Sequence, residues 1–188
     1  MTYFSQAIQE LRSVSISDLE DRVEDICREL DDETLQEGCW PVDFFPALND
    51  LLRDSKFLSV RTSWNVLRFV KSNWTFLSPA DASAFKKALV AAFDKFGDWM
   101  GSFLASEILG EYYPNEDTLE TLKRLSKTAS LPARELVPHG LETLARTTQD
   151  EHLRSLAVTE LERLLADSSG EVKREAAISL AKVTGKGS

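Results

Sequence analysis

The residues of this 188-residue chain that could do acid–base, nucleophilic or metal chemistry do not form a known reactive arrangement. The two histidines, His139 and His152, stand 13 positions apart, without HExxH spacing and without a third ligand near them. A metal site is therefore not expected. The chain also lacks a GxSxG nucleophile motif and a GxGxxG phosphate loop. We assign no catalytic residue, no cofactor-binding residue and no metal ligand, and we do not expect an enzyme.

Cysteines and carboxylates do not change this interpretation. Cys27 and Cys39 are the only cysteines, too few for a disulfide framework or a four-ligand zinc site. Cys27 is expected to pack as a small apolar residue and Cys39 to lie in a linker. Pairs of carboxylates can be drawn from the many Asp and Glu residues. Without a pocket to raise one pKa, such pairs are typical of solvated faces.

The distribution of charge is the first uneven feature of the sequence. The whole chain has a net charge of −9, and residues 18–37 carry −8 of it, with ten acidic residues against two arginines. The rest of the chain is therefore almost neutral. The ten acids are Asp18, Glu20, Asp21, Glu24, Asp25, Glu29, Asp31, Asp32, Glu33 and Glu37.

A helical stripe in this segment predicts which acids point outward. Leu19, Val23, Ile26 and Leu30 recur at helical spacing and are expected to face the core. The acids expected to project outward, and to extend into the following turn, are Glu20, Asp21, Glu24, Asp25, Asp31, Asp32 and Glu33. Two interpretations stay open: a solvated outer face of a first helix pair, or an interface for a cationic partner.

Aromatic residues are the second uneven feature, because 15 of the 17 Phe, Trp and Tyr residues lie between Trp40 and Tyr113. Spacing favours a core position for most of them. Some fall near predicted helix ends, where exposed Trp and Tyr side chains often anchor protein interfaces. Trp74 and Tyr112 are the candidates for such a role.

Hydrophobic periodicity predicts a chain of helices joined by short connections, and no stretch alternates long enough for a strand. The expected class is all-α. Ser17 and Glu20 have capping-box spacing for the acidic helix. The middle helices are expected over about 42–53, 60–71, 78–96 and 99–109, with Gly97 and Gly110 ending the last two. A later helix is expected to run without a break from Pro132 through Leu144.

Neither a membrane span nor a secretory signal is expected. The longest apolar run covers residues 88–93, far short of the roughly 20 residues that cross a bilayer. The first residues lack a basic region, an apolar region and a cleavage site. The cytoplasm is the expected location.

An internal repeat appears when residues 133–141, Ala-Arg-Glu-Leu-Val-Pro-His-Gly-Leu, are aligned with residues 172–180, Val-Lys-Arg-Glu-Ala-Ala-Ile-Ser-Leu. The offset is 39 residues. The segment around the second copy, 166–181, resembles the second half of a HEAT repeat. Asp167 matches the acid that this family places in the turn, and Lys173 matches the cation that follows. In the preceding repeat Arg134 matches the cation, whereas Ser130 stands near the acid position.

The resemblance implies a stack of about five antiparallel helix pairs, a short α-solenoid. A single repeat domain over 1–188 is predicted, with an acidic first helix pair (1–38), an aromatic-rich middle (39–114), HEAT-like repeats (115–184) and a frayed tail (185–188). HEAT arrays as a family are mostly scaffolds that bind other macromolecules.

Acidity and resemblance together suggest a non-enzymatic inhibitor or immunity protein that masks a basic protein such as a nuclease toxin. A generic adaptor in a larger assembly is the alternative. HEAT-like folds also occur among DNA glycosylases and bilin lyases. A glycosylase needs a basic surface for phosphates, which this chain lacks, so nucleic acid is not an expected partner. A membrane is not an expected partner either, because the apolar runs are short.

Overall fold

The computed structural model describes residues 3–37, 40 and 43–185, without the side chains of residues 3–5, 30–37, 62 and 76. All regular elements in these described ranges are helical and none is a strand, which confirms the predicted all-α class. In the same ranges no helix combines the length and the apolar character needed to cross a membrane. The chain divides into two compact units, Met1–Gly101 (unit 1) and Ser102–Ser188 (unit 2). The predicted single repeat domain stays a prediction.

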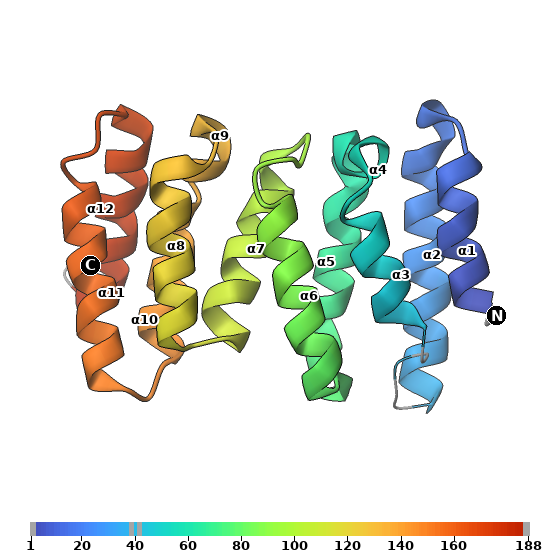
Figure 1. Ribbon diagram of the computed structural model, residues 1–188, viewed down its shortest axis with the longest axis horizontal. Coiled ribbons are helices and arrows are strands. Elements are labelled where there is room, and N and C mark those ends of the chain that lie inside the picture. The colour runs from blue at the N-terminus through green and yellow to red at the C-terminus, as the bar shows by residue number, and fades with distance from the viewer. Residues whose placement is uncertain (1–2, 38–39, 41–42, 186–188) are drawn as a thin grey trace. The chain divides into compact units, whose positions relative to one another are not determined.

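Unit 1 is built around the long helix α2. Its helices are α1 (Tyr3–Ser13), α2 (Ile16–Glu37), α3 (Phe44–Leu51), α4 (Ser55–Ser59), η1 (Arg61–Ser63), α5 (Trp64–Ser72), η2 (Trp74–Phe76) and α6 (Pro79–Ala92) (Figure 1). α2 packs against α1, η1 and α5, whereas α3 packs against α1 and α6. The acidic helix therefore contacts segments from both the start and the middle of its unit.

Aromatic residues of the middle segment fill the core of unit 1. Its largest fully buried side chains are Phe44, Phe45, Phe57, Phe85 and Phe93. Trp40 is buried beside them, with its ring centroid 4.5 Å from that of Phe44. The Trp40 indole N–H donates to the carbonyl oxygen of Asn73 at 3.2 Å, so its polar atom is satisfied inside the core.

The acidic helix begins at a different serine from the expected one. Ser15 Oγ accepts a hydrogen bond from the backbone N–H of Asp18 at 3.3 Å and donates to the Asp18 carboxylate at 2.6 Å. Ser15, two residues before the predicted Ser17, therefore caps the helix. Both serines precede the apolar stripe, so helical spacing alone did not distinguish them.

Two helices in the middle of unit 1 differ from their expected bounds. The predicted helix over 60–71 is divided, because Val60 adopts an extended conformation that ends the short helix α4, and α5 begins at Trp64. The helix predicted to reach Phe96 ends at Ala92 instead.

Gly97, expected to end that helix, lies close to the backbone at the end of α4. Its N–H donates to the carbonyl oxygen of Leu58 at 2.6 Å, and a Cβ there would lie 2.5 Å from the backbone oxygen of Ser59.

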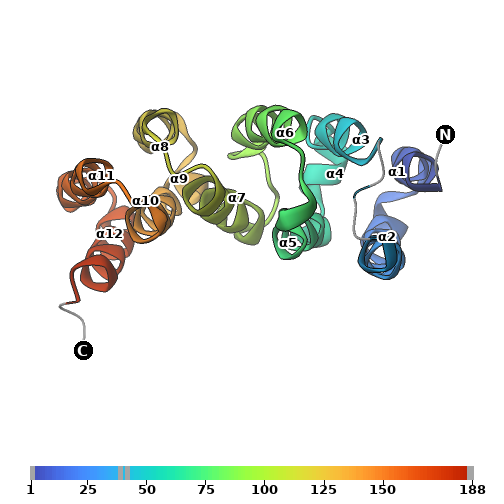
Figure 2. The ribbon, with the colours of Figure 1, turned by 90° about the horizontal axis from the view of Figure 1, so that it is seen from below.

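Unit 2 holds most of α7 (Trp99–Tyr112), then α8 (Glu116–Thr128), α9 (Leu131–Arg134), α10 (Val137–Thr147), α11 (Glu151–Leu164) and α12 (Gly170–Thr184), seen nearly end-on in Figure 2. α10 packs against α8, α11 and α12, and α11 packs against α12. Polar side chains cap three of these helices. The side chains of Asn115, Asp150 and Ser169 accept hydrogen bonds from backbone N–H groups in the first turns of α8, α11 and α12.

The helix expected to run from Pro132 to Leu144 is broken into α9 and α10. Pro138 lies in the first turn of α10, where its missing N–H leaves no intrahelical bond unmade. In a continuous helix the same residue would lack its bond to the carbonyl of Arg134 and would clash with it. The break therefore follows from Pro138, and the prediction of one helix across this residue was wrong.

Gly110 does not end a helix, as the sequence suggested, but lies inside α7 at a close approach to α10. A Cβ at this position would overlap the carbonyl oxygen of Gly140 and lie 2.7 Å from the backbone nitrogen of Leu144. Since both contacts are with backbone atoms, no side-chain movement could relieve them. The absence of a side chain at Gly110 therefore sets how closely α7 and α10 pack within unit 2.

We expect Gly110→Ala to lower the free energy of unfolding by about 1–3 kcal/mol, the usual cost of overpacking. The matched control is Gly170→Ala at the start of α12, where nothing lies within 4 Å of the added Cβ. That variant should be neutral or slightly stabilising, because alanine favours helix over glycine. Chemical denaturation followed by circular dichroism measures both. Equal effects of the two substitutions would contradict a packing role for Gly110.

Candidate functional site

The buried stripe of α2 fixes the direction of every carboxylate on that helix. Leu19, Val23 and Ile26 are fully or almost fully buried, as their spacing predicted. Acids between them therefore leave the helix on two sides. One side faces α5 and the other faces the turn between α1 and α2.

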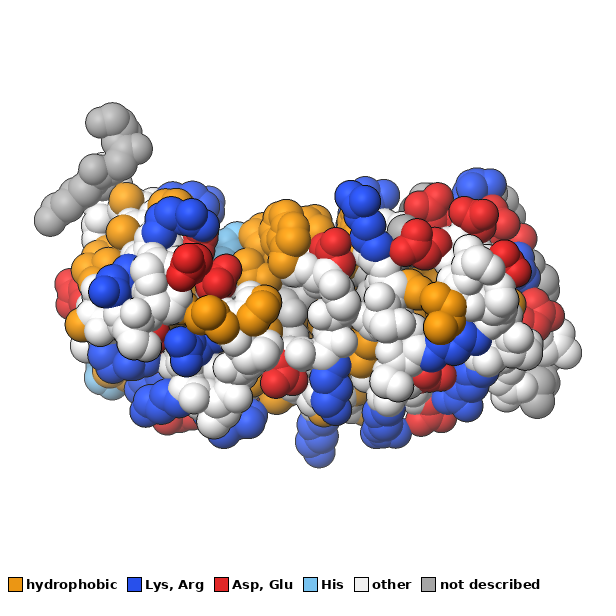
Figure 3. Space-filling model, turned by 90° about the horizontal axis from the view of Figure 1, so that it is seen from above, with side chains coloured by type: hydrophobic (Ala, Val, Ile, Leu, Met, Phe, Trp, Pro, Cys, Tyr) orange, Lys and Arg blue, Asp and Glu red, His pale blue; other side chains and the backbone are white. Residues whose placement is uncertain are grey.

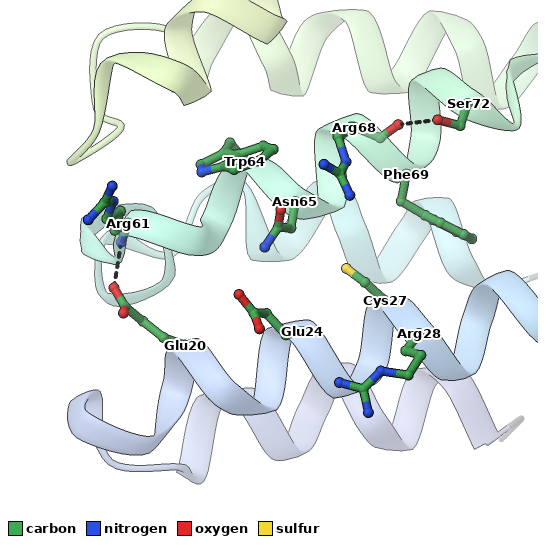
Figure 4. Close-up of a pocket in the computed structure, with 10 residues that line it drawn as sticks. All are labelled: Glu20, Glu24, Cys27, Arg28, Arg61, Trp64, Asn65, Arg68, Phe69 and Ser72. Carbon is green, nitrogen blue, oxygen red and sulfur yellow. Dashed lines mark hydrogen bonds between the residues drawn. The ribbon is translucent and has the colours of Figure 1, made fainter.

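On the first side, α2 and α5 enclose a groove of about 810 Å³ (Figure 4). Glu20 and Glu24 line it from α2, opposite Trp64, Asn65 and Arg68 from α5. Glu20 accepts a hydrogen bond from the backbone N–H of Arg61 at 3.0 Å, which ties η1 to α2. Glu24 has no hydrogen bond or ion pair among the residues that the structure describes.

Three arginines complicate this groove as an acidic surface. Arg28, Arg61 and Arg68 all line it, so its charged residues are two carboxylates and three guanidinium groups. The guanidinium carbon of Arg68 lies 5.3 Å from the ring centroid of Trp64, within the range of a cation–π contact. The groove is thus mixed in charge.

On the second side, Asp18, Asp21 and Asp25 line a shallow hollow of about 400 Å³ with Arg22. Three carboxylates face one arginine here, so this side carries the net acidity of the helix. Arg22 also pairs with Glu10 at 3.1 Å, and Asp25 pairs with Arg28 at 3.3 Å. In Figure 3, acidic side chains gather at the end of unit 1 that holds α1 and α2, with basic side chains among them.

Asp18 and Asp21 differ in how far they are engaged. Hydrogen bonds from the Ser15 and Ser17 side chains lower the pKa of the exposed Asp18 carboxyl. Asp21 is exposed and makes no hydrogen bond or ion pair with any described residue. Asp21 is therefore the acid on this side that is most available to an external cation.

The remaining predicted site residues are not brought to either side of α2. Asp31, Asp32 and Glu33 belong to α2, but their side chains lie outside the described part of the structure. Trp74 lies in η2, partly buried, with its ring centroid 6.2 Å from that of Phe85. Tyr112 belongs to unit 2, where burial, followed by the charge of Glu111, raises its pKa to about 12.

Sequence reasoning missed the α5 wall of the groove. Trp64, within the helix expected over 60–71, is only partly buried and lines the groove that Glu20 and Glu24 line from α2. Trp64 and Arg68 are four residues apart, the spacing at which side chains on one helix face meet. That pair was the available signal. Finding its partner α2 required tertiary structure.

A buried polar cluster in unit 2 surrounds Glu142 of α10. Lys182 Nζ and Ser179 Oγ of α12 each lie 3.2 Å from Glu142 Oε2, and an Arg146 nitrogen lies 3.3 Å from Oε1. The His139 ring stacks on Phe103 with centroids 4.1 Å apart, and its Nδ1 lies 3.7 Å from Glu142. Burial alone would raise the pKa of Glu142, but His139 and Lys182 lower it to about 2.

Among the described residues, no three His, Cys, Asp or Glu side chains group closely enough to hold a metal ion. His152 is exposed on α11, whereas His139 lies beside Glu142 on α10. Through Lys182 and Ser179, the Glu142 cluster joins α12 to α10.

Comparisons of the chain with protein-family models, with curated proteins and with solved structures found no match.

We expect Glu142→Gln to lower the free energy of unfolding at neutral pH by about 1–3 kcal/mol, because it weakens three polar contacts of a buried carboxylate. Glu151→Gln is the control, since that carboxylate pairs with Arg154 on the surface and is 79% exposed. A carboxylate with a lowered pKa stabilises the fold above its unfolded pKa and loses that effect as the pH falls. The difference between wild type and Glu142→Gln should therefore shrink as the pH falls from about 4.5 towards 2. Urea denaturation across this range tests it, and a difference independent of pH would contradict it.

Proposed function

We propose that the chain is a non-enzymatic protein-binding module that recognises a basic protein through the carboxylates of α2. The observation that carries this proposal is the presence of exposed, unpaired acids on the surface of α2, outside its buried stripe. The side chains of Asp21 and Glu24 stand three residues apart, one on each side of α2, and neither has a hydrogen-bond or ion-pair partner among the described residues. Like charges at this spacing repel and cost stability. A cationic partner would relieve that repulsion.

A secreted nuclease toxin is the kind of basic protein that fits best. Its own substrate carries a dense negative charge, so its active surface must be positive. An acidic protein that covers that surface inhibits by occupying it and associates quickly because opposite charges attract. This makes the chain an inhibitor or immunity protein, whereas a generic adaptor would use the same surface without blocking an activity.

The same proposal includes a HEAT-like architecture, for which unit 2 offers the support. Arg134, at the cation position of one repeat, pairs at 3.4 Å with Asp167, at the turn-acid position of the next. A pairing of this kind is what the family pattern implies between neighbouring repeats. Lys173, the other matched cation, is exposed.

Burial in unit 2 supports the 39-residue offset that the alignment suggested. Three aligned pairs are buried in both copies: Ala133 with Val172, Val137 with Ala176, and Gly140 with Ser179. Equivalent faces are thus buried in α9–α10 and in α12. Repeats of this type stack through nearest-neighbour contacts and present extended surfaces to partners.

The proposed function predicts that reversing Asp21, Glu24 and Asp25 to Lys slows association with the captured partner and flattens its salt dependence. Electrostatic steering raises association rates by about ten-fold or more at low salt, and reversal should remove most of that gain. Thermal stability should hardly change, because these side chains make few contacts within the fold. Capture from cell lysate, identification by mass spectrometry and stopped-flow kinetics at low and high salt provide the test.

The control for that experiment reverses Asp94, Glu120 and Glu162, three exposed acids outside α2, to Lys. It changes the net charge equally and should leave most of the rate intact. Equal losses in both triple variants would point to net charge alone. Unchanged kinetics in the α2 variant, with its fold intact, would make the acidic face a solubilising surface.

We also expect no binding to DNA or RNA at physiological salt, since an acidic surface meets the phosphate backbone with repulsion. Fluorescence anisotropy with labelled single-stranded and double-stranded oligonucleotides measures this. Sub-micromolar binding that weakens with salt would instead favour the glycosylase alternative.

A further inference from the structure

We infer that the groove between α2 and α5 binds a short extended segment of the protein partner that carries one basic and one acidic side chain. This inference rests on the proposed function, because it assigns a second contact to the same partner. The Asp21 side of α2 would attract the partner, and the groove would fix which segment docks.

The charges of the groove are separated along its length (Figure 4). Glu20 and Glu24 occupy one part of the α2 wall, and Arg28, which also pairs with Asp25 at 3.3 Å, follows one turn later, with Arg68 across the groove on α5. Arg61 lies at the Glu20 end, but its backbone holds Glu20 and its side chain lies 3.9 Å from Asp98. The groove therefore offers a negative region followed by a positive region.

Several polar groups in the groove still have capacity for a ligand. Neither the Glu24 carboxylate nor the Asn65 amide has a hydrogen-bond partner among the described residues. Arg68 contacts the face of Trp64 and has no carboxylate partner in the same described set. A side-chain amide both donates and accepts, so Asn65 matches the alternating groups of a peptide backbone.

The spacing of these groups fits an extended peptide. Glu24 and Arg28 are four residues apart on α2, about 6 Å along the helix. Side chains two residues apart on an extended strand point to the same side and lie about 7 Å apart. One basic residue and one acidic residue at positions i and i+2 would therefore reach Glu24 and the positive region that begins at Arg28.

Charge complementarity excludes simpler occupants. A purely basic segment would place a cation against Arg28 and Arg68. A purely acidic segment, or a phosphate group, would meet Glu20 and Glu24. Only a segment with both charges satisfies both regions, and the wrong order or sign adds repulsion, which is how interfaces obtain specificity.

The test uses four capped pentapeptides and the ¹⁵N-labelled full chain. The peptides are Gly-Lys-Ser-Glu-Gly, its reverse Gly-Glu-Ser-Lys-Gly, the all-basic Gly-Lys-Ser-Lys-Gly and the all-acidic Gly-Glu-Ser-Glu-Gly. We expect one mixed peptide to shift the Trp64 indole and Asn65 amide resonances with a Kd on the order of 1 mM. It should bind about five-fold more tightly than either peptide of single charge, as expected for exposed charge pairs.

Variants separate the groove from the rest of α2. Glu24→Gln and Arg68→Gln should each weaken the mixed peptide about three- to five-fold, since each removes one charge contact. Arg53→Gln, an exposed arginine of unit 1 outside the groove, should leave binding unchanged. All three positions are on the surface, and circular dichroism checks that the variants stay folded.

Hexalysine in the same spectra distinguishes this inference from the proposed function. Shifts at Asp21 and Asp25 with hexalysine, and none at Trp64 and Asn65 with a mixed peptide, would overturn the groove inference while supporting a cation-binding α2. Equal or tighter binding by a peptide of single charge would also overturn it. No shift with any ligand would count against both proposals.

Discussion

The burial of three apolar side chains on α2 is the constraint on which the rest of unit 1 depends. Leu19, Val23 and Ile26 must face the core, and a helix has no freedom to turn its other residues independently. Burial of that stripe therefore divides the acids into two rows. Asp18, Asp21 and Asp25 end on one side, and Glu20 and Glu24 on the other. A single packing requirement thus produces two surfaces of different character.

Local patterns in the sequence predicted the helices well, whereas close approaches between helices could not be read from them. The buried stripe of α2 was predicted because it depends on residues within a turn or two. Gly97 and Gly110 were interpreted as helix ends. Their structural role is to leave room for another backbone, and that depends on residues far along the chain.

The candidate site was predictable to the same extent and for the same reason. The outward acids of α2 follow from helical spacing on one segment, so Glu20, Asp21 and Glu24 were identified. The opposite wall, with Trp64 and Arg68, comes from a helix about 40 residues later and changes the meaning of the acids that it faces. Charge counted along residues 18–37 predicts a net-negative helix, with ten acids against two arginines. Charge counted across the groove gives a mixed surface.

The buried carboxylate of Glu142 also bears on how unit 2 comes apart. Lys182 and Ser179 on α12 contact Glu142 of α10, so detaching α12 would remove two of the contacts that offset the burial of this charge. That penalty opposes the separate loss of α12. It couples α12 to α10, so that the two are expected to unfold together as one cooperative element.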